Sequence, residues 1–130
     1  MNNKGFTLIE LLVTIALLAV LSIISFVSIN AVIEKSRKND CNSLKENIKS
    51  AAKEYLSDNR YKNNLAMTGS ISTATLINNN YLTDQITNPF TKKQITGQIT
   101  IAYTLNANYT VKTITVSGTG DASFINDCTG

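Results

Sequence analysis

The feature that most constrains this chain is an uncharged stretch of 23 residues near its N-terminus. It runs from Leu11 to Ile33, is rich in Leu, Ile, Val and Ala, and contains neither proline nor glycine. As a helix rising about 1.5 Å per residue it would span roughly 34 Å, which is enough for the ~30 Å hydrocarbon core of a bilayer. Because no residue in it interrupts a helix, the sequence predicts one membrane-spanning helix.

Two neighbouring features set this stretch apart from a simple anchor. Glu10 lies four residues into the apolar segment, which begins at Phe6. A carboxylate at bilayer depth costs about 2.5–3.5 kcal/mol on insertion scales, and such a residue usually has a partner and a function. A short polar leader, Met1 to Gly5, precedes Phe6.

The junction of Gly5 with Phe6-Thr7-Leu8-Ile9-Glu10 resembles the class III signal of type IV pilins and pseudopilins. The resemblance is close through the apolar stretch and covers only the general layout beyond it. It implies that a prepilin peptidase cuts after Gly5 and N-methylates Phe6. It also implies that Glu10 pairs with the positive N-terminal amine of a neighbouring subunit, since opposite charges attract strongly at low dielectric.

Two other interpretations of the N-terminus compete with this one. A cleavable secretory signal would have an apolar region of about 7–15 residues and a small-residue cleavage site. The run here is longer, and its best end, Ile29-Asn30-Ala31, has a bulky Ile where a small residue is needed. An ordinary anchor explains neither Glu10 nor the Gly5–Phe6 junction.

The charges around the apolar run favour one orientation in the membrane, and the pilin resemblance, which we follow, implies the other. Lys35, Arg37 and Lys38 follow the run, so a positive-inside count would place that end in the cytoplasm. The pilin resemblance implies the opposite, with the leader in the cytoplasm. Family members also often carry a proline partway along the run, near Phe26 here, and this chain has none.

The remaining residues predict one small α+β domain. We expect a leader at 1–5, the apolar half of a long helix at 6–33 and an exported head at 34–130. The helix should extend from Phe6 to about Ser57, because apolar residues continue at three- and four-residue spacing. Those residues are Cys41, Leu44, Ile48, Ala51 or Ala52, and Tyr55. The resemblance implies the same layout, a long helix packed on a small antiparallel sheet.

Further along, the chain predicts a short helix, a turn and a hairpin. Ser72 can cap a helix ending near Asn79, and Asn88-Pro89-Phe90 should form a turn. Ile99 to Leu105 alternates strictly between apolar and smaller or polar residues, as in a half-buried strand. Asn106 to Asn108 suits the hairpin loop, a phase slip on the return indicates a bulge near Thr113, and Gln94 to Thr96 could add a short strand.

Cys41 and Cys128 are the only cysteines, and they do not form a C-x-x-C motif. An even pair in an exported domain indicates one disulfide, with two free thiols as the alternative. Two lone cysteines are too few for a zinc site. We therefore expect no metal and no cofactor.

The sequence gives little support for a catalytic site or a calcium site. The chain has no histidine, which excludes histidine bases, histidine ligands and Ser-His-Asp triads. Asp121 and Asp127 could contribute to a calcium loop, but their spacing matches no ligand pattern. We expect no enzymatic activity.

Nucleic-acid binding is a further possibility. A basic stripe on the helix could attract phosphates and two tyrosines could stack bases, although a solvated helix face is the simpler interpretation. The residues concerned are Lys45, Lys49 and Lys53, and Tyr103 or Tyr109.

Together these features predict a structural subunit of a type IV pilus-like filament, with a role in adhesion or twitching motility. The implied partners are sister subunits, a prepilin peptidase, and an inner-membrane assembly platform with its ATPase. The chain would be a single-pass membrane protein before assembly and extracellular afterwards. The alternative is a pseudopilin of type II secretion or of competence DNA uptake.

Overall fold

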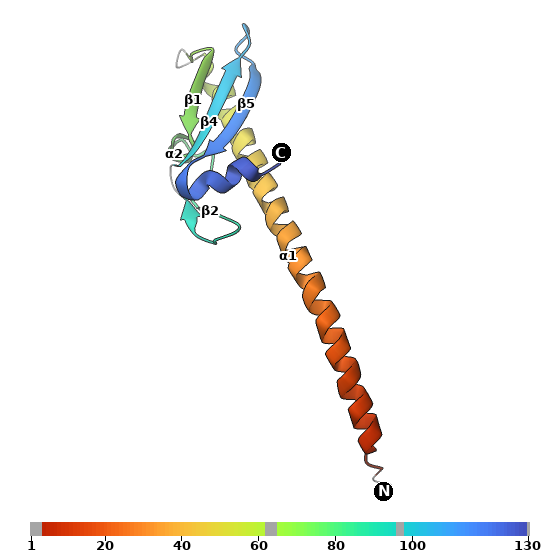
Figure 1. Cartoon of the computed structure of the whole chain (residues 1–130). Helices are drawn as coiled ribbons and strands as arrows, with labels where there is room; N and C mark the ends of the chain where they lie inside the picture. Colours follow the sequence, from red (N-terminus) through yellow and green to blue (C-terminus); the bar gives the residue numbers. More distant parts are fainter. Residues whose placement is uncertain (1–3, 62–64, 96–97, 130) are drawn as a thin grey trace. The chain divides into compact units, whose positions relative to one another are not determined.

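The computed structural model describes residues 4–61, 65–95 and 98–129. The chain divides into two compact units, Met1–Ser36 and Arg37–Gly130. Helix α1, Leu8–Asn59, begins in the first unit and ends in the second (Figure 1). The predicted helix is thus confirmed, although it begins and ends two residues later than expected.

The Arg37–Gly130 unit is an α+β domain. Its main sheet has three antiparallel strands in the order β1-β4-β5, formed by Thr68–Ser72, Ile99–Leu105 and Val111–Gly118 (Figure 1). A second antiparallel pair joins β2, Ile86–Thr87, to β3, Gln94–Ile95. Thr96, which the sequence also assigned to this strand, lies outside the described residues.

Strand β4 forms the centre of the core. Its residues alternate between buried and more exposed positions, as the sequence predicted. Ile99 and Ile101 are fully buried, and they pack with Ile48 of α1 in one cluster. Leu56 of α1 anchors a second cluster with Tyr103. The apolar stripe of α1 is therefore the surface against which the sheet packs.

The hairpin between β4 and β5 carries the predicted irregularity. Thr104 pairs with Thr113, but Leu105 pairs with Val111, so Lys112 is skipped in the register. The bulge therefore lies beside Thr113, as the phase slip indicated.

Two short helices complete this unit. Helix α2, Thr73–Asn78, has Ser72 as its N-cap, and the Ser72 hydroxyl accepts from the Thr75 N–H. The 3₁₀ helix η1, Gly120–Asp127, follows β5 and leads to Cys128. The cap of α2 was predicted, whereas β1, β2 and η1 were not.

Candidate functional site

The N-terminal end of α1 is closed by a reciprocal pair of hydrogen bonds. The Thr7 N–H donates to Glu10 Oε2 at 2.9 Å, and the Glu10 N–H donates to Thr7 Oγ1 at 3.4 Å. This is a capping box, in which two side chains satisfy two N–H groups that the helix leaves unpaired. Glu10 thus has a structural role within the single chain, besides any role between chains.

The residues just before this cap are open to solvent. Gly5 and Phe6 precede the helix, and Phe6 is 89% exposed. A side chain built on Gly5 would meet no atom within 4 Å. The Gly5–Phe6 peptide bond therefore lies in an exposed segment outside the helix. Residues 1–3 of the expected leader lie outside the described residues.

Glu10 is surrounded by apolar surface. It lines an open hollow of about 400 Å³ with Phe6, Ile9, Val13 and Thr14. A carboxylate in such surroundings gains little from water once the surface is covered, so it needs a positive or donating partner there.

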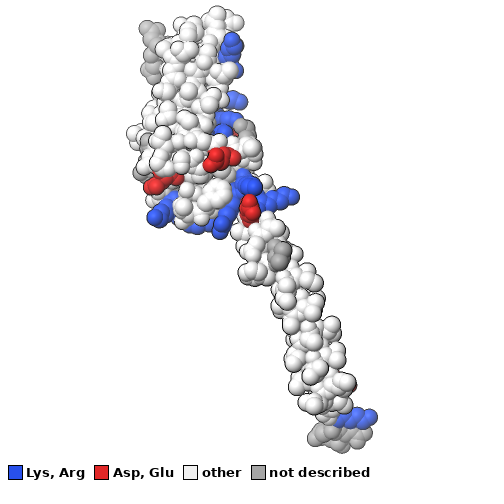
Figure 2. Space-filling model, in the orientation of Figure 1, with Lys and Arg blue, Asp and Glu red and all other residues white. Residues whose placement is uncertain are grey.

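The surface of the Met1–Ser36 unit is largely white in Figure 2 because few of its residues are charged, and most of its exposed side chains are large and apolar. This helix is long and apolar enough to cross a membrane by length and composition. Three serine hydroxyl groups of this helix find their hydrogen-bond acceptors within the helix itself, so they need no water molecule as a partner. Ser22, Ser25 and Ser28 each donate to the carbonyl four residues earlier, at 2.7, 2.8 and 3.1 Å. The segment therefore suits an apolar environment, whether lipid or packed helices.

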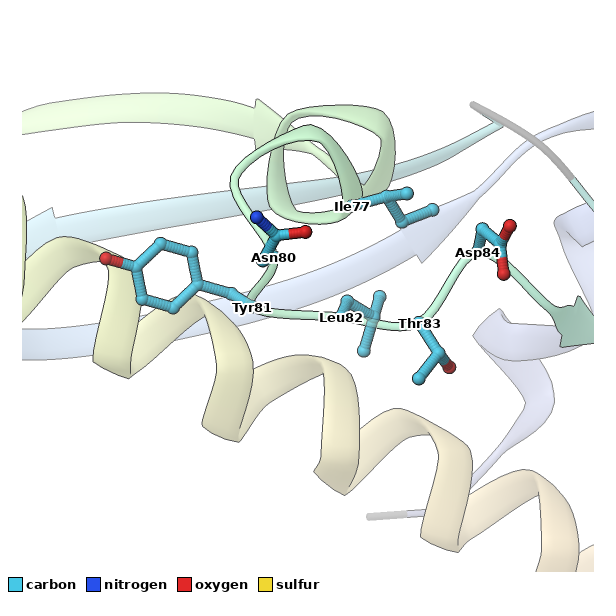
Figure 3. Close-up of a pocket in the computed structure, with 6 residues that line it drawn as sticks. All are labelled: Ile77, Asn80, Tyr81, Leu82, Thr83 and Asp84. Atoms are coloured by element: carbon cyan, nitrogen blue, oxygen red, sulfur yellow. The ribbon is translucent and has the colours of Figure 1, made fainter.

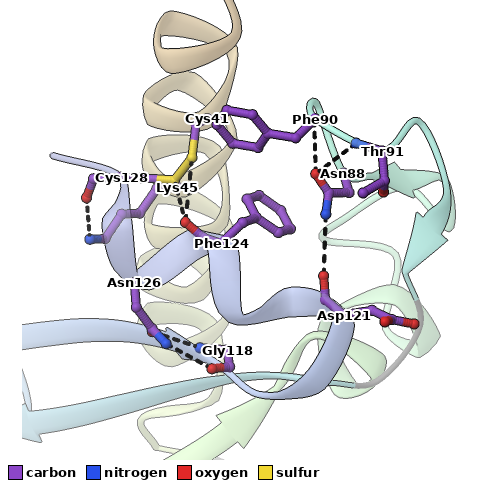
Figure 4. Close-up of a disulfide and its surroundings, with 10 residues drawn as sticks. All are labelled: Cys41, Lys45, Asn88, Phe90, Thr91, Gly118, Asp121, Phe124, Asn126 and Cys128. Atoms are coloured by element: carbon purple, nitrogen blue, oxygen red, sulfur yellow. Dashed lines mark hydrogen bonds between the residues drawn. A yellow bond between two sulfur atoms is a disulfide. The ribbon is translucent and has the colours of Figure 1, made fainter.

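Cys41 of α1 and Cys128 after η1 form a disulfide, with their Cα atoms 5.6 Å apart (Figure 4). The Lys45 ammonium donates to the Cys128 carbonyl at 2.8 Å and holds the same tail on the helix. Both cysteines are buried. The disulfide thus joins the segment after η1 covalently to α1 within the buried core.

Two asparagines fix the segments around the disulfide. The Asn126 side chain bonds both the N–H and the carbonyl of Gly118, at 3.0 and 2.9 Å (Figure 4). The buried Asn88 side chain accepts from the N–H groups of Phe90 and Thr91 and donates to the Asp121 carbonyl. The predicted Asn-Pro-Phe turn is confirmed, and Asn88 ties it to η1.

A shallow hollow of about 470 Å³ lies beside α2 (Figure 3). Tyr81 points from it toward α1, where its hydroxyl donates to Asp58 Oδ2 at 2.9 Å and its ring meets Tyr55 edge-on. The hydrogen bond to the Asp58 carboxylate raises the pKa of Tyr81. These contacts attach the segment after α2 to the long helix, and we assign them a structural role.

The calcium hypothesis gains no support from the structure. Within the described part of the chain, no group of three or more His, Cys, Asp or Glu side chains is placed to hold a metal ion. The N–H of Asp121 donates to Gln98, and its carbonyl accepts from Asn88. The backbone at Asp121 is therefore held by hydrogen bonds to side chains of two other segments of the chain.

Comparison with protein families matches residues 1–26 to the prokaryotic N-terminal methylation motif. The match includes Gly5, Phe6 and Glu10 and covers 26 of 130 residues. Comparison of the chain with curated proteins and with solved structures gives no significant match. The sequence signal at the N-terminus is thus shown independently of the fold, and it supports a protein of the type IV pilin-like or pseudopilin kind.

Proposed function

We propose that this chain, whose first 26 residues carry the N-terminal methylation motif, is a structural subunit of a type IV pilus-like filament. The observation that carries the proposal is the position of the motif. Its Gly5–Phe6 junction lies exposed directly before a long apolar helix that has a single carboxylate, Glu10, in its first turn. The same motif favours a structural subunit over an enzyme.

Processing would create the charge that assembly uses. Hydrolysis of the Gly5–Phe6 amide by a prepilin peptidase adds water and leaves a Gly5 carboxylate and a Phe6 amine. Transfer of a methyl group from a sulfonium donor then forms an N–C bond and breaks a C–S bond, which gives a secondary amine, a thioether and one released proton. An α-amino group has a pKa of about 8, so this end remains mostly cationic at neutral pH.

In the filament Glu10 would pair with the Phe6 amine of an adjacent subunit. The capping box leaves room for this, because a carboxylate has about four acceptor sites and the Thr7 N–H occupies one. An uncompensated charge between packed apolar helices is strongly unfavourable, so the pairing would favour one stagger between subunits over others.

The apolar helix would serve two environments in turn. Before assembly it would hold the chain in the inner membrane as a single-pass protein, with the leader in the cytoplasm. An assembly platform and its ATPase would then move it into a bundle of sister helices, where it exchanges lipid for packed side chains. Head-to-tail contacts that do not close would generate an open helical fibre outside the cell.

Two variants separate the charge of Glu10 from its capping role. Glu10→Gln keeps an acceptor for the Thr7 N–H, since Gln also completes a capping box, but it removes the charge. Thr7→Ala removes the hydroxyl from the box and keeps the charge. We expect Glu10→Gln to abolish filaments seen by electron microscopy of cells and Thr7→Ala to leave most of them. Filaments that survive Glu10→Gln at normal yield would refute the pairing.

A second candidate function is a pseudopilus subunit of type II secretion or of competence DNA uptake. The feature that favours it is the disulfide between a cysteine early in the exposed part of α1 and one near the C-terminus, a layout that resembles competence pseudopilins. Deletion of the gene distinguishes the two. Loss of surface filaments and twitching supports the pilus, whereas loss of secretion or transformation with no surface filament supports the pseudopilus.

A further inference from the structure

A hollow of about 350 Å³ lies between the end of α1 and the β4–β5 hairpin. Its lining residues all belong to the Arg37–Gly130 unit, so its geometry does not depend on the apolar half of the helix. They are Lys53, Ser57, Arg60, Tyr109, Thr110 and Val111. The hollow is large enough for a small ligand or one unit of a polymer.

The charge at this hollow is positive. Lys53 and Ser57 lie one turn apart on α1, and Arg60 directly follows the end of this helix at Asn59; all three line the hollow. No carboxylate belongs to the lining. On the face shown in Figure 2, blue side chains follow one edge of this unit toward its upper end.

Among the carboxylates of α1, Glu46 lies two turns before Lys53 on the same face and forms its ion pair with Lys49, at 2.8 Å. The two carboxylates nearest the hollow in sequence lie on other faces. Glu54 follows Lys53 directly and is therefore turned about 100° away around the helix. Asp58 accepts the Tyr81 hydroxyl, on the side where α2 packs. Within the described residues, neither Lys53 nor Arg60 forms an ion pair. Both cations are thus available to an anionic ligand.

Two aromatic rings complete the site. Tyr61 is 76% exposed, and its ring lies 6.5 Å from that of Tyr109. The Arg60 guanidinium lies over the Tyr61 ring, 4.8 Å from its centroid. This cation–π contact places the positive charge of Arg60 against one face of the exposed Tyr61 ring.

The backbone of Tyr109 is an outlier. Its φ of 57° is in the left-handed region, which Gly and Asn adopt far more readily than a bulky aromatic residue. The hairpin holds it there, because the Tyr109 N–H donates to the Asn106 carbonyl and the Asn106 N–H donates to the Thr110 carbonyl. Because glycine would adopt this backbone conformation without strain, the presence of a tyrosine here indicates that its ring has a function.

We propose that this hollow binds single-stranded nucleic acid. Lys53 and Arg60 contact phosphates, and an unpaired base stacks on the exposed ring of Tyr61, beside which the Tyr109 ring lies at an interplanar angle of 55°. Bases in a duplex are already stacked and present no free face, whereas single strands are bound through this combination of cations and aromatic platforms. Tyr103, the other tyrosine considered from the sequence, is only 6% exposed and faces β1, so it is excluded as a platform.

The test measures binding of the full chain in detergent to a fluorescently labelled oligo-dT of about ten nucleotides, a length within the usual site sizes. Two phosphate contacts predict that log K falls with log salt with a slope of about −1.4. Tyr61→Ala should weaken binding at least about fivefold by removing a stacking surface. Lys53→Gln with Arg60→Gln should bring the slope close to zero.

The matched control is Lys92→Gln with Lys93→Gln, two exposed lysines of the β2–β3 loop whose loss changes the net charge equally. It should leave the affinity and the slope unchanged. Equal weakening by this control would overturn the proposal, as would tighter binding of duplex DNA or equal competition by inorganic polyphosphate. The measurement uses single chains, so its failure would leave the proposed filament role untouched.

Discussion

Removal of the Cys41–Cys128 disulfide should destabilise the Arg37–Gly130 unit severely. The two residues are 87 positions apart. On the chain-entropy model, a loop of that length contributes about 4.5 kcal/mol by restricting the unfolded chain. A unit of this size loses roughly 4–8 °C of melting temperature per kcal/mol. The double variant Cys41→Ala and Cys128→Ala should therefore melt about 20 °C or more below the native protein.

Tyrosine fluorescence is a selective assay for this change. The chain has no tryptophan, and all its tyrosines lie in the Arg37–Gly130 unit, so the signal does not report on the apolar half of α1. The tyrosines are Tyr55, Tyr61, Tyr81, Tyr103 and Tyr109. Urea unfolding in detergent then gives the free energy of unfolding of this unit.

The single variants provide the control. Cys41→Ala and Cys128→Ala break the same bond, so each should cost nearly as much as the double variant, and native protein with a reductant should behave like them. A loss below about 1 kcal/mol on reduction would refute the loop-entropy argument. Loss in the variants but not on reduction would indicate that packing of the buried sulfurs, and not the cross-link, stabilises the domain.

Three further predictions concern the same unit. Gly118→Ala should cost about 1–3 kcal/mol or more in urea unfolding, because the added methyl group would overlap the Ala122 carbonyl. Ser72→Ala should cost about 1 kcal/mol by removing the N-cap of α2, and a normal unfolding midpoint would contradict that cap. The Asp58 carboxylate raises the pKa of Tyr81, so this bond should stabilise the fold fully below the ordinary pKa of about 10 and be lost as pH rises through the raised value. Ultraviolet titration of tyrosine ionisation in the native protein and in Tyr81→Phe tests whether Tyr81 loses its proton at a higher pH than an ordinary tyrosine.

The elements with strong periodicity could be predicted from the sequence. The apolar run, the stripe on α1 and the alternation of β4 each follow from a single repeating pattern, and the structure contains all three. The stripe was slightly misassigned. Leu56 is fully buried, whereas Tyr55, which was expected in the core, is half-buried beside Tyr81. Which of two neighbouring apolar residues on a helix is more deeply buried cannot be predicted until the surface that packs against the helix is known.

Strand β1 could not be predicted because its sequence carries almost no strand signal. Thr68 to Ser72 contains one large apolar residue, Ile71, and a glycine, and its pairing depends on β4. The glycine has a physical reason that only the fold reveals. A side chain at Gly69 would come within 2.8 Å of the Tyr103 hydroxyl, so the ring packs where a side chain would otherwise stand.

The candidate site was partly readable in the sequence. Gly5, Phe6 and Glu10 follow from the N-terminal signal. The capping box was equally visible, since Thr7 and Glu10 have the spacing T-x-x-E just before an apolar run. Lys53 and Tyr109 were considered from the sequence for nucleic-acid binding, but the hollow that they line was not visible, because it depends on the hairpin returning Tyr109 to the end of α1 beside Arg60.

The most direct test of the account is the intact mass and N-terminal sequence of the protein isolated from its native membrane. We expect a chain that begins at methylated Phe6 and is two hydrogens lighter than its reduced form, owing to the Cys41–Cys128 bond. A chain that retains Met1, or one that begins after Ala31, would contradict the central claim. The protein would then be an anchored or a secreted α+β domain with no role in a filament.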